Sequence, residues 1–195
     1  VFVSPGIPTG LSDELMALDE VTKLSRSRAT IVGFEDRPLI LGAVDADIFD
    51  LIKTENIAGS KEEFVKPNAM GVLKQKAERD NLGIGDEIAL TIPEEGKRTF
   101  TIEYIFDWTT PPPAEFFLLL ENYSFFSEES LDTEIYFNVK EKNEATQEKL
   151  DRIVSDYPGA KLRDQDGLVE EANTQIQQLL NVIYGFLSIS IFVAL

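Results

Sequence analysis

The strongest β-structure signal in the sequence is the stretch Ile84-Gly-Asp-Glu-Ile-Ala-Leu-Thr-Ile-Pro-Glu-Glu-Gly-Lys-Arg-Thr-Phe-Thr-Ile-Glu-Tyr-Ile-Phe106. Apolar residues alternate with polar ones over 88–92 and again over 100–106, which is the period of a strand with one buried face. Between these runs, residues 94–97 suit a tight turn, because Gly96 adopts a positive φ without strain. The stretch therefore predicts a β-hairpin.

The residues before this hairpin predict a loop, a helix and a turn. Residues 57–65 are polar and predict a loop, whereas 69–80 place apolar side chains at helical spacing. A turn follows at 82–86 and leads into the first strand of the hairpin. The order helix, turn, strand excludes a phosphate-binding loop, and the stretch has neither G-x-G-x-x-G nor Gly-Lys-Ser/Thr. The residues expected to form this structural turn are Leu82, Gly83, Gly85 and Asp86.

Two further segments predict the fold class. Residues 29–44 read as a second hairpin. Residues 133–139 predict a strand, 143–157 a helix and 160–163 a short strand, which is the order of a split β-α-β unit. We therefore expect an α+β domain with mixed and antiparallel sheets and short helices. It should span residues 1–169, with one subdomain centred on 67–110 and another on 1–50 plus 116–165.

The composition argues against several classes of function. The chain has 195 residues, a net charge of −17, no Cys and no His. It therefore has no thiol nucleophile and lacks the commonest zinc ligand and general base. A nucleic-acid backbone and anionic lipid headgroups would both repel it. We predict no catalytic, metal or cofactor-binding residue, since an anchored hydrolase would need a carboxylate pair in a cleft and the acids are scattered.

Two short acidic motifs each allow a second interpretation. Asp45 and Asp47 precede a short apolar segment and could act as an acid/base pair, but helix capping is the simpler interpretation. Residues 164–167 are similar to the start of a calcium loop, yet Leu162 and Asn173 stand where the first ligand and the closing Glu belong. We expect both motifs to begin helices.

A candidate partner-binding loop follows the hairpin of 84–106. The segment Trp108-Thr-Thr-Pro-Pro-Pro113 combines an aromatic residue with a rigid proline run, as some peptide-recognition surfaces do. An ordered connection between two strands explains the same residues. The sequence leaves both interpretations open for Trp108, Pro111, Pro112 and Pro113.

The last 24 residues, 172–195, carry no charge. Their first half is amphipathic at helical spacing, and the final 14 residues, from Val182, are almost wholly apolar. A spanning helix needs about 20 such residues, so we expect 170–195 to be a stalk helix that enters a membrane and continues beyond Leu195. The alternative is a buried C-terminal helix of a soluble domain. The predicted stalk and coupling residues are Ala172, Ile176, Leu179, Leu180 and Ile183.

Three segments are similar to a known family in their sequence and order. Residues 71–88 are similar to its small helix, Leu-Gly-x-Gly-Asp turn and following strand, and 175–188 to its stalk and the start of its second membrane helix. Residues 6–21 fit the first helix after its first membrane span. Over most of its length the chain thus resembles the extracytoplasmic (MacB-like periplasmic core) domain of a MacB/FtsX-type ABC transporter permease. The proline run 111–113 and the acidity depart from the family pattern, so the family's ligand does not carry over.

The resemblance implies one part of a transport machine, placed on the extracytoplasmic side of the cell membrane. Such permeases pair with a cytoplasmic ABC ATPase and dimerise with a second permease copy. The outer domain passes ATP-driven motion to an extracellular peptide, lipoprotein or cell-wall protein, in export or in signalling. Any ATPase activity would lie in a separate subunit or domain, so we do not expect this domain to be an enzyme.

The alternative function is a membrane-anchored extracellular binding or receptor module with no transport role. That module would have one membrane helix in its full gene, where a permease would have four. The sequence does not identify a cargo. The acidity favours cationic partners, because long-range attraction steers opposite charges together.

Overall fold

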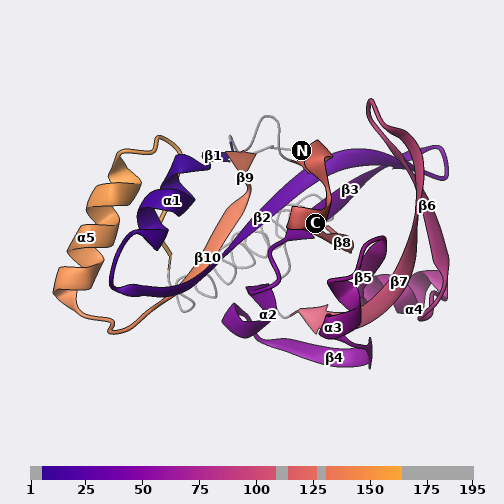
Figure 1. Ribbon diagram of the computed structural model, residues 1–195, viewed down its shortest axis with the longest axis horizontal. Helices are drawn as coiled ribbons and strands as arrows, with labels where there is room; N and C mark the ends of the chain where they lie inside the picture. The colour runs from indigo at the N-terminus through magenta and orange to yellow at the C-terminus, as the bar shows by residue number, and fades with distance from the viewer. Residues whose placement is uncertain (1–5, 109–113, 127–130, 164–195) are drawn as a thin grey trace, which may run out of the picture. The chain divides into compact units, whose positions relative to one another are not determined.

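A closed barrel of six strands forms the centre of the structure (Figure 1), a computed structural model that describes residues 6–108, 114–126 and 131–163. The strands pair in the order β2, β3, β8, β5, β7, β6 and back to β2. The β3–β8 and β5–β7 pairs are parallel and the others are antiparallel. The bounds are β2 (Val21–Phe34), β3 (Arg37–Val44), β5 (Ala69–Leu73), β6 (Glu87–Ile92), β7 (Gly96–Trp108) and β8 (Phe116–Leu119).

The interior of the barrel holds the larger hydrophobic core. Side chains alternate between the two faces of a strand, so each of the six strands sends part of its residues inward. Removing a side chain of this size from water contributes roughly 1.5–3 kcal/mol. The barrel interior is therefore a packed apolar core. Its inward residues include Val32, Leu41, Met70, Val72, Leu90, Phe100, Ile102, Phe116 and Leu118, each at most 2% exposed.

A second hydrophobic cluster covers the outer face of β3, β7 and β8. Two short helices, α2 (Ile48–Leu51) and α3 (Lys61–Phe64), supply its cover. Phe49 of α2 meets the rings of Phe64 and Phe106 edge-on, with centroids 5.5 Å apart in each case. Edge-to-face pairs of this kind add about 0.5–1.5 kcal/mol beyond the area they bury. The barrel wall on this side is therefore buried on both faces.

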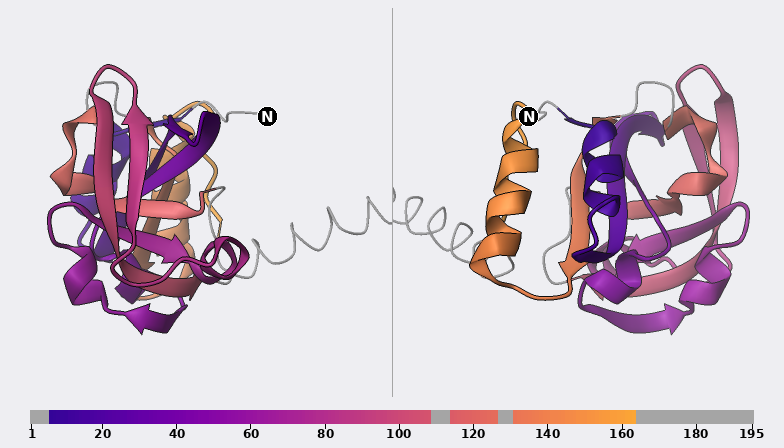
Figure 2. Two further views of the ribbon diagram at one scale, coloured as in Figure 1. Left: turned by 90° about the vertical axis from the view of Figure 1, so that its right-hand side faces the viewer. Right: turned by 60° about the vertical axis from the view of Figure 1, so that its left-hand side comes forward.

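The first half of β2 extends beyond the barrel and pairs with β10 (Glu134–Val139), which continues the same sheet. α1 (Gly10–Met16) packs on β2, and α5 (Glu144–Ser155) packs on α1. The two helices lie side by side in both Figure 1 and Figure 2. Asn143 begins α5, since its side-chain oxygen accepts a hydrogen bond from the backbone N–H of Thr146 over 2.9 Å.

A two-stranded ribbon of β1 (Ile7–Pro8) and β9 (Leu131–Asp132) completes this part of the fold. We call β1, α1, β9, β10, α5 and residues 21–27 of β2 the lobe. Ser27 of β2 pairs with Glu134 on one side and with Val44 on the other. One uninterrupted strand therefore connects the lobe to the barrel.

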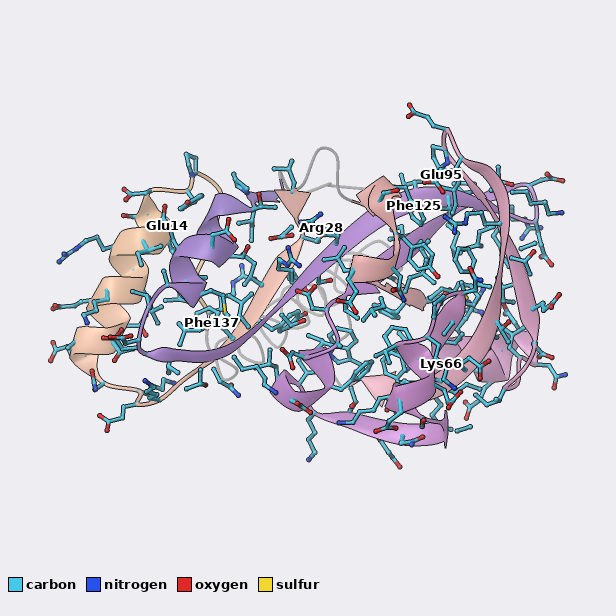
Figure 3. All side chains as sticks on the ribbon, viewed as in Figure 1. Glu14, Arg28, Lys66, Glu95, Phe125 and Phe137 are labelled. Carbon is cyan, nitrogen blue, oxygen red and sulfur yellow. The ribbon has the colours of Figure 1, made fainter. Side chains whose placement is uncertain are left out.

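An ion pair shielded from solvent joins β2 to β9. Arg28 Nε donates a hydrogen bond to Asp132 Oδ1 over 2.7 Å, and the two side chains are 7% and 0% exposed. Figure 3 labels Arg28 where β2 passes β9. Two residues earlier on β2, Arg26 forms a second pair. Asp45 Oδ2 accepts hydrogen bonds from the backbone N–H and from Nε of Arg26, over 2.8 and 2.9 Å. Both carboxylates anchor arginines of the strand that the lobe and the barrel share.

The two predicted hairpins and the α+β class with mixed sheets and short helices are confirmed. β6 and β7 pair from Glu87 with Thr101 to Ile92 with Gly96, and Gly96 has the positive φ, 84°, that the turn requires. β2 and β3 pair continuously up to a turn at residues 35–36.

The helix predicted for residues 69–80 is wrong over its first part. Ala69–Leu73 form β5, and only Lys74–Asp80 form a helix, α4. β5 lies between β7 and β8 and bonds to both, with Met70 and Val72 fully buried. A run that is buried on both faces and bonded on both edges is stable as a strand, whatever its helical spacing suggests.

The predicted split β-α-β unit lacks its second strand. Residues 160–163 form no strand in the structure. The chain turns at Pro158-Gly159, where Gly159 has a φ of 92°, and the exposed Lys161 and Arg163 flank Leu162. One half-buried apolar residue between two charged ones offers a sheet too little apolar surface to hold a strand. β10 therefore pairs with β2 alone among the described strands.

Contacts divide the chain into residues 1–160 and 161–195, and every element above belongs to the first unit. The predicted stalk and coupling residues 172–183, the whole of 164–195 and the prolines of 111–113 lie outside the described residues. In the ranges that the structure does describe, no helix has the length and apolar character needed to span a membrane. The division into two subdomains stays a prediction.

Candidate partner-binding site

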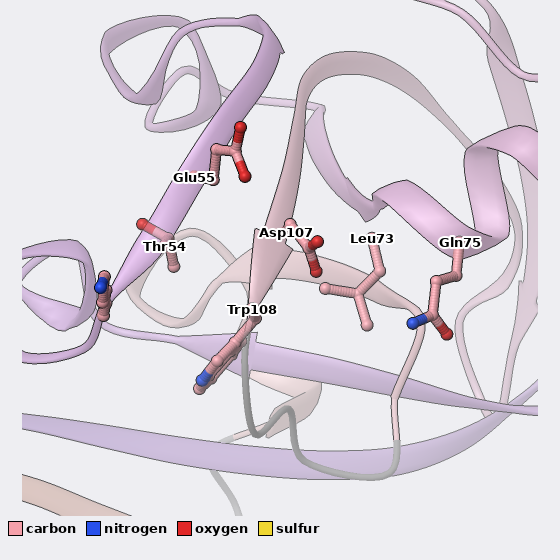
Figure 4. A pocket seen from close by; sticks show the side chains of 7 residues that line it. Thr54, Glu55, Leu73, Gln75, Asp107 and Trp108 are labelled. Atoms are coloured by element: carbon pink, nitrogen blue, oxygen red, sulfur yellow. The ribbon is translucent and has the colours of Figure 1, made fainter.

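A pocket of about 420 Å³ lies where β4 (Thr54–Gly59) meets the end of β7 (Figure 4). The loop predicted for 57–65 is thus wrong: the segment contains the end of β4 and the helix α3. The strand forms because β7 continues past the barrel and offers a bonding edge to polar residues that have no burial of their own. The pocket is lined by Lys53, Thr54, Glu55, Leu73, Gln75, Asp107 and Trp108.

The pairing of β4 with β7 sets the geometry of this pocket. Thr54 lies opposite Trp108 and Glu55 opposite Asp107. Residues directly opposite each other point to the same face of a sheet, with Cβ atoms about 4.5–5.5 Å apart. The two carboxylates therefore stand side by side on one face of the sheet, although 52 positions separate them in the sequence (107 − 55), while Thr54 and Trp108 point to the other face and the pocket reaches both at the end of the strands.

The predicted partner-binding residue Trp108 is held in the second hydrophobic cluster. Its side chain is 4% exposed, and its ring lies 5.5 Å from that of Phe117 and 6.0 Å from that of Tyr136. Packed on both sides in this way, the indole forms a fixed wall of the pocket. The partner-binding role of the loop stays a prediction, because its prolines lie outside the described residues.

Within the described residues, the carboxylates of Glu55 and Asp107 have no cationic partner of the kind that several other carboxylates of the molecule have. Arg79 holds the pKa of Glu115 below its ordinary value, and Lys23 does the same for the pKa of Asp50. For Glu55 and Asp107 the described part of the chain supplies no ion pair. With Lys53 as the single cation of the lining, the pocket carries a formal charge of −1 (two carboxylates, one ammonium). It can accept a cation without losing an internal partner.

The predicted turn over Leu82–Asp86 is a compact hydrogen-bonded unit beside the barrel. Asp86 Oδ2 accepts a hydrogen bond from the backbone N–H of Gly83 over 2.7 Å. Gly85 has a φ of 88° and its N–H donates to the carbonyl of Ile102 over 2.8 Å. The first bond closes the turn and the second docks it on β7, and none of the turn's residues lines the pocket. The structural role of the four turn residues stays a prediction, and the hydrogen bonds above describe the geometry of the turn.

Replacing Asp86 with alanine is expected to lower the free energy of unfolding by about 1 kcal/mol. The substitution removes a charge-assisted acceptor and leaves the N–H of Gly83 to solvent. Asp86→Asn retains an acceptor at the same place and should lose less. Urea unfolding followed by circular dichroism checks the difference; equal losses in both variants would show that the side-chain bond is not the cause.

The acidic pair Asp45 and Asp47 forms neither an acid/base site nor a helix cap. Asp47 occupies the first flanking position of α2, but its side chain makes no capping hydrogen bond and lies 3.3 Å from Lys23 Nζ. Asp45 binds Arg26, so the expectation that these residues cap the helix is wrong. Both carboxylates form ion pairs with cations of β2, and neither accepts a hydrogen bond from the first backbone N–H groups of the short helix α2. Among the described residues, no group of three or more acids could hold a metal ion.

Comparison with solved structures agrees with this architecture. A domain of a permease protein from Porphyromonas gingivalis aligns with a TM-score of 0.52 and 18% identity, over 79% of this chain and 75% of that one. The extracellular domain of the noncanonic ABC-type transporter YknZ from Gram-positive bacteria aligns at 0.52 and 12%, over 75% and 81%. The periplasmic region of MacB from Actinobacillus actinomycetemcomitans aligns at 0.49 and 9%, over 75% and 70%. No family model and no curated protein matches the sequence.

The two alignments with a TM-score of 0.52 define the class of fold. The chain has the fold of the extracytoplasmic domains of ABC transporter permeases, and the predicted resemblance to the MacB-like periplasmic core domain is confirmed at that level. The solved domains that share it include those of YknZ and of the Porphyromonas gingivalis permease.

Proposed function

We propose that this chain is the extracytoplasmic domain of an ABC transporter permease subunit, which passes ATP-driven motion of membrane helices to an extracellular substrate or partner. The observation that carries the proposal is the shared fold, which covers three quarters or more of this chain and of two such domains. The uncharged segment 172–195 supports it, because a domain of this kind needs a membrane helix. A cytoplasmic ATPase and a second permease copy are the partners that this function requires.

The connection between lobe and barrel supports a mechanical role. β2 runs for 14 residues through both parts, and the buried pair of Arg28 and Asp132 ties it to β9. A strand bonded on both sides resists bending, since bending would break its ladder of hydrogen bonds. A displacement applied to the lobe would therefore reach the barrel and the pocket beside β4 with little loss. In this proposal residues 172–183 are the lever.

The membrane stalk is tested by comparing residues 1–195 with a form that ends at residue 171. We expect the shorter form to stay in the aqueous phase and to unfold in urea with an unchanged midpoint, and the longer form to partition into detergent. That result follows if residues 172–195 add nothing to the hydrophobic cores described above. Loss of cooperative unfolding in the shorter form would assign the tail to the core and remove the membrane part of the proposal.

Motion of the domain is tested in the full-length permease with its ATPase, reconstituted in nanodiscs. Residues 1–195 contain no Cys, so Glu148→Cys on the exposed face of α5 adds a single labelling site to this domain, used after any cysteines elsewhere in the permease and in the ATPase have been replaced by serine. We expect a distance distribution between two copies that shifts by several ångströms between the nucleotide-free and the ATP-trapped state. An unchanged distance between the two labels when ATP is trapped would favour the anchored receptor module. So would the absence of any dipolar signal between two copies.

A further inference from the structure

β4 is the last strand of the eight-stranded sheet, beyond β7. In Figure 1 it runs along the lower border of the ribbon, below α2 and α3, and Figure 2 shows it again at the outer border. Among the strands that the structure describes, β4 pairs with β7 alone, so its other edge has no strand beside it. Such an edge presents a row of N–H and C=O groups to which an extended polypeptide can add as a further strand.

The side chains along this edge leave it accessible. Glu55, Asn56 and Ile57 are exposed, with Ile57 at 39%. Ile57 is the extra residue of a bulge, because Asn56 pairs with Phe106 and Ala58 with Ile105. A bulge interrupts pairing, so a docked strand would run along Lys53–Asn56 and meet Ile57 as an apolar contact at one end.

The pocket beside β4 then selects the chemistry of the added strand. A residue opposite Glu55 on a new strand would point to the same face as Glu55 and Asp107, over the pocket. A lysine or arginine there reaches Glu55 directly and Asp107 through its long side chain. Opposite charges on neighbouring strands stabilise the pair, whereas the present Glu55–Asp107 neighbours repel.

We propose that the free edge of β4 binds an extended segment of a partner protein by strand addition, with a lysine or arginine of that segment over Glu55 and Asp107. A second copy of this chain fits the edge less well, because pairing β4 with β4 would bring further carboxylates to those already there. The proposal concerns binding by the domain itself. It holds whether or not the domain is coupled to an ATPase.

The test uses the whole 195-residue chain in detergent and a short capped peptide in which valine and threonine alternate around two lysines on one face. Trp108, the single tryptophan of the chain, lines the pocket, so its fluorescence reports binding. We expect saturable binding that protects from hydrogen exchange those backbone amides of Thr54–Asn56 that face away from β7. N-methylation of alternate peptide nitrogens on one edge should weaken the affinity at least about tenfold, since it removes the ladder hydrogen bonds.

Two matched double variants separate the specific carboxylates from the overall charge. The double variant Glu55→Gln with Asp107→Asn should weaken the affinity for the peptide about five- to thirtyfold. The double variant Glu144→Gln with Glu148→Gln, on the exposed face of α5, removes as many charges and should change that affinity less than about twofold. The proposal fails if the lysine peptide does not bind, if N-methylation leaves its affinity unchanged, or if the two double variants weaken it equally. A dimer that forms through β4 and excludes the peptide would also overturn it.

Discussion

The variant Arg28→Met is expected to lower the free energy of unfolding by about 3–5 kcal/mol. It removes the hydrogen bond from Nε to Asp132 Oδ1 and leaves a carboxylate that is 0% exposed without its partner. The other oxygen, Asp132 Oδ2, has no hydrogen-bond partner among the described residues, so the bond from Arg28 is the one side-chain hydrogen bond described for this carboxylate. Urea unfolding at pH 7 measures the loss.

The loss should depend on pH, with a sign that the burial of Asp132 dictates. Burial raises the pKa of Asp132, and the hydrogen bond from Arg28 lowers it, so removing Arg28 raises the folded-state pKa further. Above the unfolded value of about 3.9, the folded protein then binds more protons than the unfolded chain, and stability falls as pH rises to the folded pKa. The difference between the wild type and Arg28→Met is therefore small near pH 4 and grows toward neutral pH.

Two controls assign the effect to this pair. The double variant Arg28→Met with Asp132→Leu should recover most of the loss, since replacing a whole buried pair by apolar side chains is often close to neutral. Arg98→Met, at an exposed pair in which Arg98 Nη1 lies 2.8 Å from Glu95, should cost about 1 kcal/mol or less. A loss from Arg28→Met that stays constant from pH 4 to pH 8 would contradict the role given to Asp132.

The variant Gly42→Val is expected to lower the free energy of unfolding by about 3 kcal/mol, and Gly42→Ala by about 1–3 kcal/mol. A Cβ atom at Gly42 would lie 2.8 Å from two ring carbons of Phe117 and 3.1 Å from the Cβ of Ala114. Phe117 is fully buried, and the rings of Phe106 and Trp108 lie 5.7 and 5.5 Å from it, so it has no space to move into. The cost is steric, because Gly42 does not have a positive φ.

Gly83→Ala is the matched control for the same added methyl group. At Gly83 the nearest atom to a new Cβ is Asp86 Oδ2 at 3.8 Å, which is an ordinary contact. We expect stability to change by less than about 0.5 kcal/mol, or to rise slightly because alanine restricts the unfolded chain. Thermal or urea unfolding of the three variants checks the order Gly42→Val, Gly42→Ala, Gly83→Ala. Equal effects at Gly42 and Gly83 would show that the contact with Phe117 is not the cause.

Local patterns in the sequence were sufficient where an element is built from neighbouring residues. The alternation over 88–106 with Gly96 between its two runs predicted the β6–β7 hairpin, and Asn143 marked the start of α5. In both cases one short segment contains the apolar period and the turn or cap that it needs. Such elements follow from the spacing of side chains on a pleated or helical backbone.

Long-range pairing decided the elements that the sequence alone predicted wrongly. Residues 69–73 and 74–80 share an apolar spacing that suits one helix, yet insertion between β7 and β8 makes the first segment a strand. The polar segment 54–59 is a strand only because β7 runs on beside it. Neither partner strand is adjacent in the sequence, so no local period could reveal the pairing.

By itself, the sequence determined the α+β class, the two hairpins and the strongly acidic, Cys- and His-free composition, because each follows from residue types and their spacing over short distances. The partner-binding role that the sequence suggested for Trp108, from its neighbouring proline run, stays a prediction. Only the tertiary structure decided that the strands close into a barrel, that Arg28 meets Asp132, and that Glu55 stands beside Asp107. Those contacts join residues far apart in the chain, and the packing of the whole barrel is what brings them together.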